Sequence, residues 1–464
     1  MPDARLLITN DKKYWKIQSF DASRKMRGIM KIHCKLMLIG ALLSLFAGCG
    51  SKESTEAVRK NVLNNGVSVL TKETGNGVVS YSVWFKTGSR NEDEEINGIS
   101  HFIEHLIFKG SKTGKVNELS KTIESLGGHL NGATSNDFTY YYFTIAAKFA
   151  DRARDGMMDC LVNPAFEAAE IEKERKVVIE EIMRKQDNPY GYMYEKIYEA
   201  SYATHPYRRP VIGTKEIIAN VSRDTLLKYY QTHYSPENTV IVAVGDFETG
   251  ALLEKIKKYY PGMENARAEP AAALNLKADF KSGKISEETK FKQAYAAYSW
   301  PAPSASNTDN YAMDVLATVL GKGLSSRFYR QVKDAKQLCY GISADYSTMK
   351  DEGLFVVSGE LESGNIEKFK TAFFEELQKV KKEGIPQIEL DKVITMIENG
   401  YIFGHETNEA IGHALGYYEV VSSFKQELTY IEKIKAVKTE DVKRIANKYL
   451  SGEPSEVILR PKAR

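Results

Sequence analysis

At 464 residues, with 42% hydrophobic and 27% charged side chains, the chain has globular composition and enough length for two to four domains. Its formal net charge is +3, but residues 1–48 hold nine Lys and Arg against three Asp and Glu, so the rest carries −3. That balance argues against a nucleic-acid partner, which would favour a clustered basic surface. Only Cys160 and Cys339 lie beyond residue 49, which excludes a disulfide framework and leaves one bridge or two buried thiols.

The segment 1–49 is predicted to be a targeting leader. Two lysines precede an apolar run over 36–47, which is short for a membrane span and typical of a signal-peptide core. The run ends in a sequence that resembles the cleavage box of bacterial lipoproteins, so Cys49 is the expected lipidated residue. We therefore expect an exported, periplasmic protein attached to a membrane surface, and Gly50 favours the outer membrane. The alternatives are a plain signal peptide or an anchor helix, and Met30 offers a second start.

The first half of the body shows strand patterns followed by a helix start. Alternating apolar and polar residues from Val62 to Lys86 predict two strands that pair as a hairpin. Ser100 is the expected N-cap of a helix that carries the apolar-rich run 101–108. The other expected elements are a helix over 116–126, a strand over 138–143, a long charged helix over 166–185 and a strand over 238–245.

After a linker-like segment over 261–279, the second half repeats this order weakly. We expect a strand over 293–299, helices over 310–320 and 325–334, strands over 339–346 and 353–359, and a helix over 366–383. Two homologous α+β halves follow from this repeat. The predicted organisation is a leader at 1–49, a catalytic half at 57–262, a linker at 263–283 and a non-catalytic half at 284–464.

The pattern HFIEH at residues 101–105 is the main chemical signal. His101 and His105 are four residues apart, so on a helix both imidazoles lie on one face and can bind one metal ion. Zinc suits this pair and lowers the pKa of a bound water to about 7. Glu104 would then accept the proton of that water during attack on a peptide carbonyl, and deliver it to the leaving amine. The second half has MDVLA at 313–317 in this place, without a histidine.

A catalytic zinc site usually has three protein ligands and one open position, so a third ligand is required. The long charged helix offers five carboxylates, and spacing alone does not choose among them. The candidates are Glu170, Glu172, Glu174, Glu180 and Glu181.

The stretch 88–110, with GSR at its start and NGISHFIEHLIFKG at its end, resembles the pitrilysin/insulinase family of zinc metallopeptidases. The likeness is greatest to short members such as the β subunit of mitochondrial processing peptidase, and it covers about residues 60–460. It implies two ferredoxin-like α/β halves that face each other across a peptide-binding cavity, with one Zn²⁺ per chain. It also implies a homodimer, or a heterodimer with an inactive homologous chain.

The resemblance also implies roles for single residues. In that family the third ligand is a glutamate seventy-odd residues after the motif, in a pattern like ERxVVxEE. The sequence ERKVVIEE at 174–181 fits, and its spacing of 76 residues from His105 favours Glu181 over Glu180. The auxiliary acidic residue of the family would be Glu174.

Two further segments resemble parts of the family that contact substrate. The run 131–142 resembles the edge strand to which an extended peptide adds by main-chain hydrogen bonds, so Asn131 and Ala133 would flank the scissile region. The run 330–341 resembles a segment whose Arg and Tyr reach the substrate. Tyr340 matches it, whereas Lys333 stands where Arg is usual and lacks the planar fork of that side chain.

Other readings remain open at this point. The rival from another class is a non-catalytic binding or assembly subunit, and a third is a zinc hydrolase that acts on something other than peptides. His405 is followed by Glu406 but lacks the second histidine of an HExxH site. The remaining histidines of the body show no ligand spacing and are predicted to be structural: His129, His205, His233 and His413.

Overall fold

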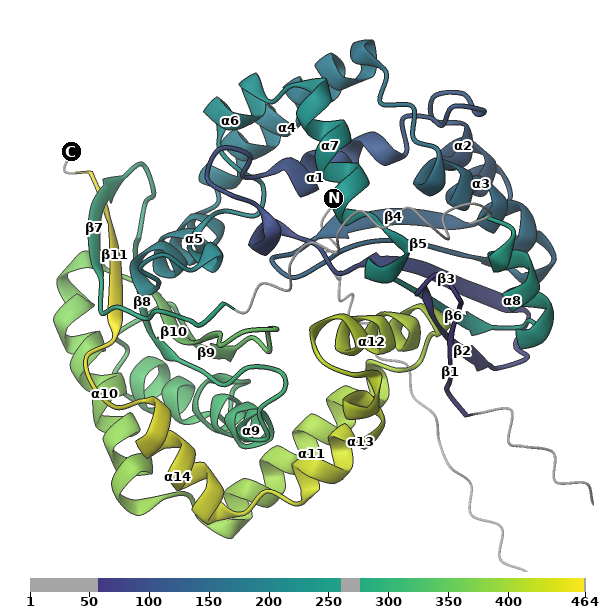
Figure 1. Cartoon of the computed structure of the whole chain (residues 1–464). Coiled ribbons are helices and arrows are strands. Elements are labelled where there is room, and N and C mark those ends of the chain that lie inside the picture. Colours follow the sequence, from purple (N-terminus) through teal and green to yellow (C-terminus); the bar gives the residue numbers. More distant parts are fainter. Residues whose placement is uncertain (1–56, 260–275, 463–464) are drawn as a thin grey trace, which may run out of the picture. The chain divides into compact units, whose positions relative to one another are not determined.

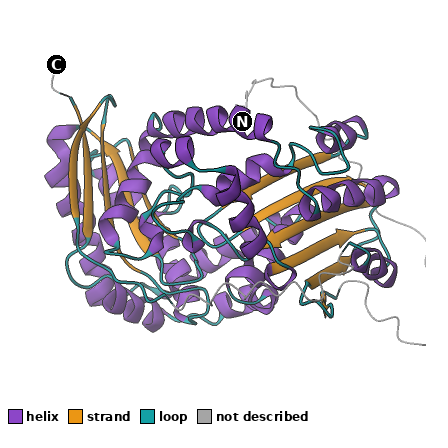
Figure 2. Ribbon diagram, turned by 45° about the horizontal axis from the view of Figure 1, so that its top comes forward, coloured by secondary structure: helices purple, strands orange, loops and turns teal. Residues whose placement is uncertain are grey.

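The computed structural model describes residues 57–259 and 276–462. The predicted leader, Cys49 and Met30 lie outside these residues, as does most of the predicted linker over 263–283. Within them the chain builds two mixed β-sheets with helices packed alongside (Figure 1, Figure 2). This arrangement confirms the predicted α+β class.

Six strands form the first sheet: β1 (Arg59–Val62), β2 (Ser68–Glu73), β3 (Val78–Phe85), β4 (His129–Thr134), β5 (Thr139–Ala146) and β6 (Thr239–Gly245). Their order is β1-β2-β6-β3-β5-β4, which leaves β4 at one edge. Because β6 lies between β2 and β3, parallel to the first and antiparallel to the second, the predicted hairpin is wrong. Every residue of β6 is buried, and a strand that is buried on both faces belongs in the middle of a covered sheet.

Five strands form the second sheet: β7 (Lys284–Thr289), β8 (Ala294–Pro301), β9 (Gly341–Tyr346), β10 (Leu354–Leu361) and β11 (Ser455–Pro461). Their order is β7-β11-β8-β10-β9. The second sheet repeats strands β2 to β6 of the first sheet, taken in chain order, as strands β7 to β11. The spatial order is the same, and so are the strand directions, since β7 and β11 are parallel like β2 and β6, and the other neighbours are antiparallel. The internal repeat predicted from the sequence is therefore present in the topology.

The helices of the first part of the chain are α1 (Ile99–Ile107), α2 (Glu118–Ser125), α3 (Ala150–Val162), α4 (Ala168–Gln186), α5 (Pro189–Ser201), α6 (Lys215–Asn220), α7 (Arg223–His233) and α8 (Thr249–Lys257). The predicted helices over 116–126 and 166–185 are confirmed as α2 and α4. α1 contacts β4 and β5, and its buried Phe102, Ile103 and Leu106 join the core that this face of the sheet shares with α3. The apolar side of α1 therefore fixes which of its residues stay accessible.

The helices of the second part are α9 (Asp309–Gly321), α10 (Ile366–Glu383), α11 (Gln387–Phe403), α12 (Asn408–Val421), α13 (Phe424–Lys435) and α14 (Thr439–Tyr449). The predicted helix over 325–334 starts late and forms a π-helical segment, η6 (Tyr329–Ala335). Gly323, with φ of +78°, and the Ser326 hydroxyl, which donates to the Gly323 carbonyl, make a turn that delays it. Among the described helices, none has the length and apolarity needed to cross a bilayer.

Two helices pack on the sheet of the opposite half. α5 lies against β8 and β11, where Met193 and Ile197 are fully buried. In return, α12 lies against β3 and β6 of the first sheet. A Cβ at Gly416 would stand 2.3 Å from the ring of Trp84, so only glycine permits this close approach. Each sheet is thus covered in part by a helix from the other half.

The two cysteines of the body are not bridged. Cys160 is buried, Cys339 is half-buried, and both are free thiols. The prediction of no disulfide framework is confirmed for the described residues.

Candidate metal centre

α1 is held at its start by a buried carboxylate rather than by the predicted Ser100 cap. The N-cap position is Gly98, with φ of 95°, and Ser100 lies inside the first turn. Glu92 Oε2 accepts from the backbone N–H of Gly98 at 2.7 Å and Oε1 accepts from that of Ser100 at 2.8 Å. A carboxylate satisfies these free N–H groups and complements the helix dipole better than a serine hydroxyl does.

Three potential metal ligands converge between α1 and α4. His101 and His105 lie one turn apart on α1, with ring centroids 4.8 Å from each other. Glu181 projects from α4, and its Oε2 lies 3.4 Å from His105 Nε2 and 3.9 Å from His101 Nε2. The donor atoms of the three residues all fall within 4.8 Å of one another, and in the described chain no other group of His, Cys, Asp and Glu is brought together in this way.

This donor set fits zinc. Zinc binds histidine nitrogen and carboxylate oxygen at about 2.0–2.2 Å, and a tetrahedral arrangement then separates two ligands by about 3.4 Å. The separations of 3.4 and 3.9 Å therefore match ligands around a common ion better than they match good hydrogen bonds. Three protein donors would leave a fourth position for a reactant.

Glu174 lies two turns before Glu181 on α4 and contacts the other nitrogen of His105. Its Oε2 is 3.3 Å from His105 Nδ1, and its Oε1 pairs with Lys109 Nζ at 2.8 Å. A carboxylate at the second nitrogen of a metal-binding imidazole fixes the tautomer and the ring orientation. The geometry of Glu174 thus suits orientation of His105, while the lysine anchors the end of α1 to α4.

Glu104 faces the edge strand β4. Its Oε2 accepts a hydrogen bond from the Thr134 hydroxyl at 2.8 Å. A Cβ at Gly132 would lie 3.3 Å from Glu104 Cγ, so the glycine leaves room for this side chain. The carboxylate therefore lies between the metal-ligating face of α1 and the strand to which a peptide could add.

Burial and neighbouring charges set the protonation of the site. Burial, reinforced by the charge of His105, lowers the pKa of His101 to about 4, which favours the neutral form that binds metal. Burial alone would also lower the pKa of His105, but the nearby carboxylates of Glu181, Glu104 and Glu174 outweigh that effect and raise it. Burial raises the pKa of Glu104, whereas the contact with His105 lowers that of Glu181.

The predicted substrate residues are placed differently in the two halves. Asn131 and Ala133 lie on β4, which pairs only with β5 among the described strands, and so their strand offers a free edge. Lys333 lies over the ring of Tyr329, and Tyr340 donates its hydroxyl to Glu362. The structure thus brings together the residues of the first half, but for the described chain it records no contact of Lys333 or Tyr340 with the metal-ligating cluster.

Sequence reasoning missed the anchors of the loop that precedes α1. Besides Glu92, the buried Arg90 forms an ion pair with Asp351 of the second half, and Asp351 also accepts from His205 at 3.1 Å. No local pattern separates Glu92 from the three acidic residues that follow it. The ion pair joins residues 261 positions apart, beyond the range of any local signal.

Comparison with known proteins gives consistent matches along most of the chain. A family model described as insulinase (peptidase family M16) matches residues 68–215, and one described as the peptidase M16 inactive domain matches residues 220–397. The uncharacterized zinc protease YmxG of Bacillus subtilis is 27% identical, over 87% of this chain and 98% of its own length. The zinc protease PqqE of Helicobacter pylori is 28% identical, over 86% of this chain and 92% of its own.

Solved structures share the fold. A protease from Helicobacter pylori superposes with a TM-score of 0.82 at 26% identity, covering 88% of this chain and 100% of that one. A peptidase M16 inactive domain from Pseudomonas fluorescens superposes with a TM-score of 0.78 at 19% identity, covering 88% and 98%, which speaks for the fold alone.

Proposed function

The chain belongs to the insulinase family of M16 peptidases, and we propose that it is a zinc metalloendopeptidase that hydrolyses peptides or extended polypeptide segments. The observation that carries the proposal is the convergence of His101, His105 and Glu181 beside Glu104. These are the residue types of a catalytic zinc site with three protein ligands, and Glu104 stands one helical position from His105. The relatives named as zinc proteases agree with this reading.

One Zn²⁺ held by His101, His105 and Glu181 would supply Lewis-acid polarisation of the scissile carbonyl and acidify a water molecule. The residues of the chain do the remaining work. Glu104 accepts the proton of the attacking water and passes it to the leaving amine. The Thr134 hydroxyl donates to Oε2 of Glu104, which leaves Oε1 available to take the proton.

Substrate is proposed to add to β4 as a further strand. Its main chain would pair with the free edge, with Asn131 and Ala133 beside the scissile bond. Glu174 is a positioning residue in this scheme, because it touches His105 and Lys109 and would not touch the peptide.

The test is cleavage of a quenched fluorescent peptide library by the wild type and by Glu104→Gln, with zinc measured on both. We expect the variant to keep about one zinc per chain and to lose about a hundredfold to ten-thousandfold in cleavage rate. Equal cleavage by the two proteins would contradict the role of Glu104. Zinc binding without cleavage by either protein would favour the second candidate, a non-catalytic binding subunit.

Export, lipidation of Cys49, a periplasmic membrane location and dimer formation remain proposals that rest on sequence patterns and family resemblance. Labelled palmitate incorporated into the wild type and not into Cys49→Ser would support the lipid anchor. Sedimentation of the purified protein would measure the oligomeric state.

A further inference from the structure

The edge strand β4 carries a side chain that touches the proposed base. Alternation along β4 turns Gly132 and Thr134 toward α1. The Thr134 hydroxyl donates to Oε2 of Glu104 at 2.8 Å. β4 is also the strand whose free edge is proposed to receive the peptide. One strand therefore contacts the carboxylate that is to accept the proton and offers its edge to the substrate that is to be cut.

The orientation of a glutamate carboxylate is not fixed by its own rotamers. The last torsion of this side chain joins an sp³ carbon to an sp² carbon, and its preference is broad. A neighbouring donor must therefore select the rotation that presents a given oxygen to a reactant. For Glu104 the Thr134 hydroxyl is such a donor.

Thr134 is itself held in place by the turn that follows it. A β-branched side chain has a stiff first torsion. The backbone N–H of Ser135 donates to the carbonyl of Phe138 at 2.8 Å, and the carbonyl of Ser135 accepts from the N–H of Ser89 at 3.2 Å. The second of these bonds ties the end of β4 to the loop that leads into α1. The Thr134 hydroxyl thus has a defined position relative to α1.

The second half of the chain holds the same turn. Asp137 is 4% exposed, and both oxygens of its carboxylate accept hydrogen bonds. Tyr207 donates its hydroxyl to Oδ1 at 2.5 Å, and the backbone N–H of Lys350, which belongs to the second half, donates to Oδ2 at 3.0 Å. Hydrogen bonds from both halves therefore fix the position from which Thr134 reaches the base.

From this arrangement we propose that Thr134 is a positioning residue of the reaction. Its hydroxyl holds Oε2 of Glu104 and so fixes the rotation of the carboxylate, which keeps Oε1 directed at the attacking water. In this role Thr134 acts through Glu104 and touches no reacting atom. The inference rests on the proposed function, because it concerns the base of the same enzyme.

The rival explanation is that Thr134 only packs β4 against α1. Thr134→Val keeps the shape of the side chain and removes the hydroxyl, whereas Thr134→Ser keeps the hydroxyl and removes a methyl group. If packing is the role, Thr134→Val should be the milder change. If the hydroxyl positions Glu104, Thr134→Ser should be the milder change, so the two explanations predict opposite orders.

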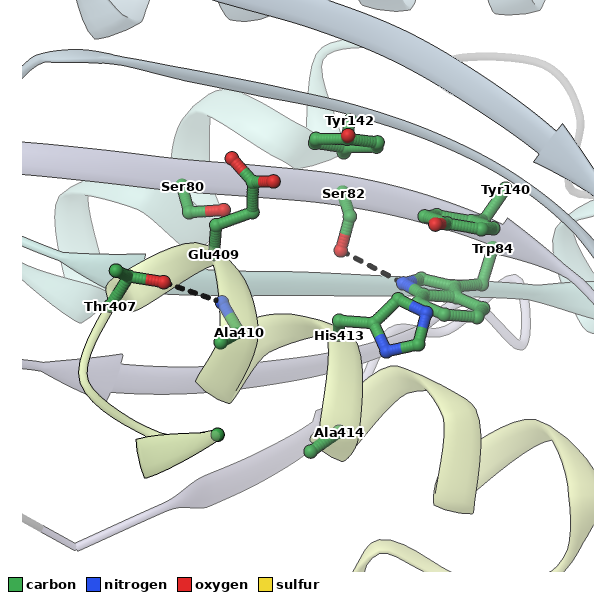
Figure 3. Close-up of a pocket in the computed structure, with 11 residues that line it drawn as sticks. Ser80, Ser82, Trp84, Tyr140, Tyr142, Thr407, Glu409, Ala410, His413 and Ala414 are labelled. Atoms are coloured by element: carbon green, nitrogen blue, oxygen red, sulfur yellow. Dashed lines mark hydrogen bonds between the residues drawn. The ribbon is translucent and has the colours of Figure 1, made fainter. Parts of the chain in front are cut away.

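A matched hydroxyl lies on the opposite face of the first sheet. Thr144 of β5 donates to Oε2 of Glu409 at 2.8 Å, and like Thr134 it is half-buried. Glu409 projects from the first turn of α12 into a cavity of about 410 Å³ that Tyr142 also lines (Figure 3). None of the proposed metal ligands lines this cavity, so Thr144→Val removes the same kind of bond away from the proposed base.

The first experiment measures kcat and KM for a capped fluorogenic peptide on the zinc-loaded full chain. kcat is taken from the plateau of the pH profile, so that a change in the protonation of Glu104 does not imitate a change in its orientation. We expect Thr134→Val to lose about tenfold to hundredfold in kcat, because a small misplacement of a catalytic group is that costly. KM and the zinc content should stay near those of the wild type.

Three further proteins complete this experiment. Thr134→Ser should keep most of kcat, and so should the control Thr144→Val. In the background of Glu104→Gln, Thr134→Val should cause no further loss of the residual cleavage, because no base is left to orient.

A second measurement does not depend on cleavage. A capped dipeptide hydroxamate binds zinc through its oxygens and carries a hydroxyl that can donate to Glu104, whereas the same dipeptide ending in a carboxylate carries none. Kd of both ligands is measured by titration calorimetry on the zinc-loaded full chain. We expect Thr134→Val to weaken binding of the hydroxamate about tenfold and to leave binding of the carboxylate unchanged.

The outcomes separate this inference from the proposed function. An unchanged kcat or an unchanged Kd for the hydroxamate in Thr134→Val overturns the positioning role, as does an equal loss of kcat in Thr144→Val. If the wild type cuts no peptide but its affinity for the hydroxamate depends on the Thr134 hydroxyl, the positioning role stands and the peptidase proposal fails.

Discussion

α1 and α9 follow equivalent strands of two sheets that share one topology, but only α1 carries potential metal ligands. On α1 the side chains of His101, Glu104 and His105 are partly accessible, because α4 and β4 border this face without filling it. α9 is buried along almost its whole length and is covered by α11, α13 and α14. The same topological position can therefore carry a site in one half and only core residues in the other. The helices packed around that position decide whether polar side chains stay accessible there.

The strongest test gives α1 the residues of α9. The triple variant His101→Met, Glu104→Leu and His105→Ala should lose stoichiometric zinc and at least about a thousandfold in cleavage. Its melting temperature without zinc should fall little, since Met and Leu match His101 and Glu104 in volume and the ring that His105→Ala removes is partly accessible. Zinc analysis, peptide cleavage and thermal unfolding check these points. A variant that no longer folds would show that the polar face of α1 is structural.

The next prediction concerns the ion pair of Arg90 with Asp351, which links the two halves of the chain. Asp351→Asn removes the charge that faces the buried Arg90, and we expect the free energy of unfolding to fall by about 3 kcal/mol. Urea denaturation measures this loss. Asp334→Asn, on an exposed side chain of the same half, is the control and should change stability by less than about 0.5 kcal/mol. Equal effects of the two changes would mean that the ion pair does not hold the halves together.

A smaller effect is expected at the close approach of α12 to the first sheet. Gly416→Ala would place a Cβ 2.3 Å from the Trp84 ring, and such overpacking should cost about 2 kcal/mol of stability. At Gly400 in α11 a Cβ meets nothing within 4 Å, so Gly400→Ala should be stabilising by up to about 1 kcal/mol. Chemical denaturation of both variants compares the positions. A neutral result at Gly416 would show that α12 can move away from the sheet at little cost.

The smallest effect is a pH dependence built into α9. Burial raises the pKa of the Asp314 carboxyl to about 7, although the Tyr430 hydroxyl bonded to it acts in the opposite direction. An unfolded aspartate titrates near about 3.9, so between about pH 4 and pH 7 the folded state binds more protons and stability falls as pH rises.

Asp314→Asn cannot titrate and should remove that fall, for a gain of about 1–3 kcal/mol at pH 8 relative to pH 5. Denaturation in urea with EDTA present, at both pH values, isolates the effect from metal binding. Parallel stability profiles of the wild type and the variant would mean that Asp314 stays ionised in the fold.

The sequence predicted the parts of the site that depend on local spacing. His101 and His105 share a helix face because they are four residues apart, and the structure has them on α1. The choice of Glu181 among five carboxylates came only from family resemblance, because no local rule says which turn of α4 faces α1. The Ser100 cap was wrong for the same reason: a serine before an apolar run is a good local signal, but Glu92 folds back and takes its place.

The longer-range features could not be derived from local patterns. Strands β2 and β3 are neighbours in the chain, yet β6, more than 150 residues later, inserts between them as a fully buried strand. His413 has no ligand spacing and reads as structural, but α12 brings it beside Tyr140 and Trp84 of the first sheet. Such placements depend on which face of each helix and strand its neighbours leave uncovered in the folded chain. Local sequence patterns do not show this.

The exchange of α5 and α12 has a consequence for how this protein could be divided. A cut between α8 and β7 would separate two fragments, each holding one complete sheet and a helix whose apolar side belongs to the other. Neither fragment could cover its own sheet, so each alone would expose the surface that Met193 and Ile197, or Trp84, bury in the intact chain. If the two fragments were expressed together, these surfaces would drive them to reassemble. The exchanged helices would then contribute more to holding the halves together than the polypeptide link does.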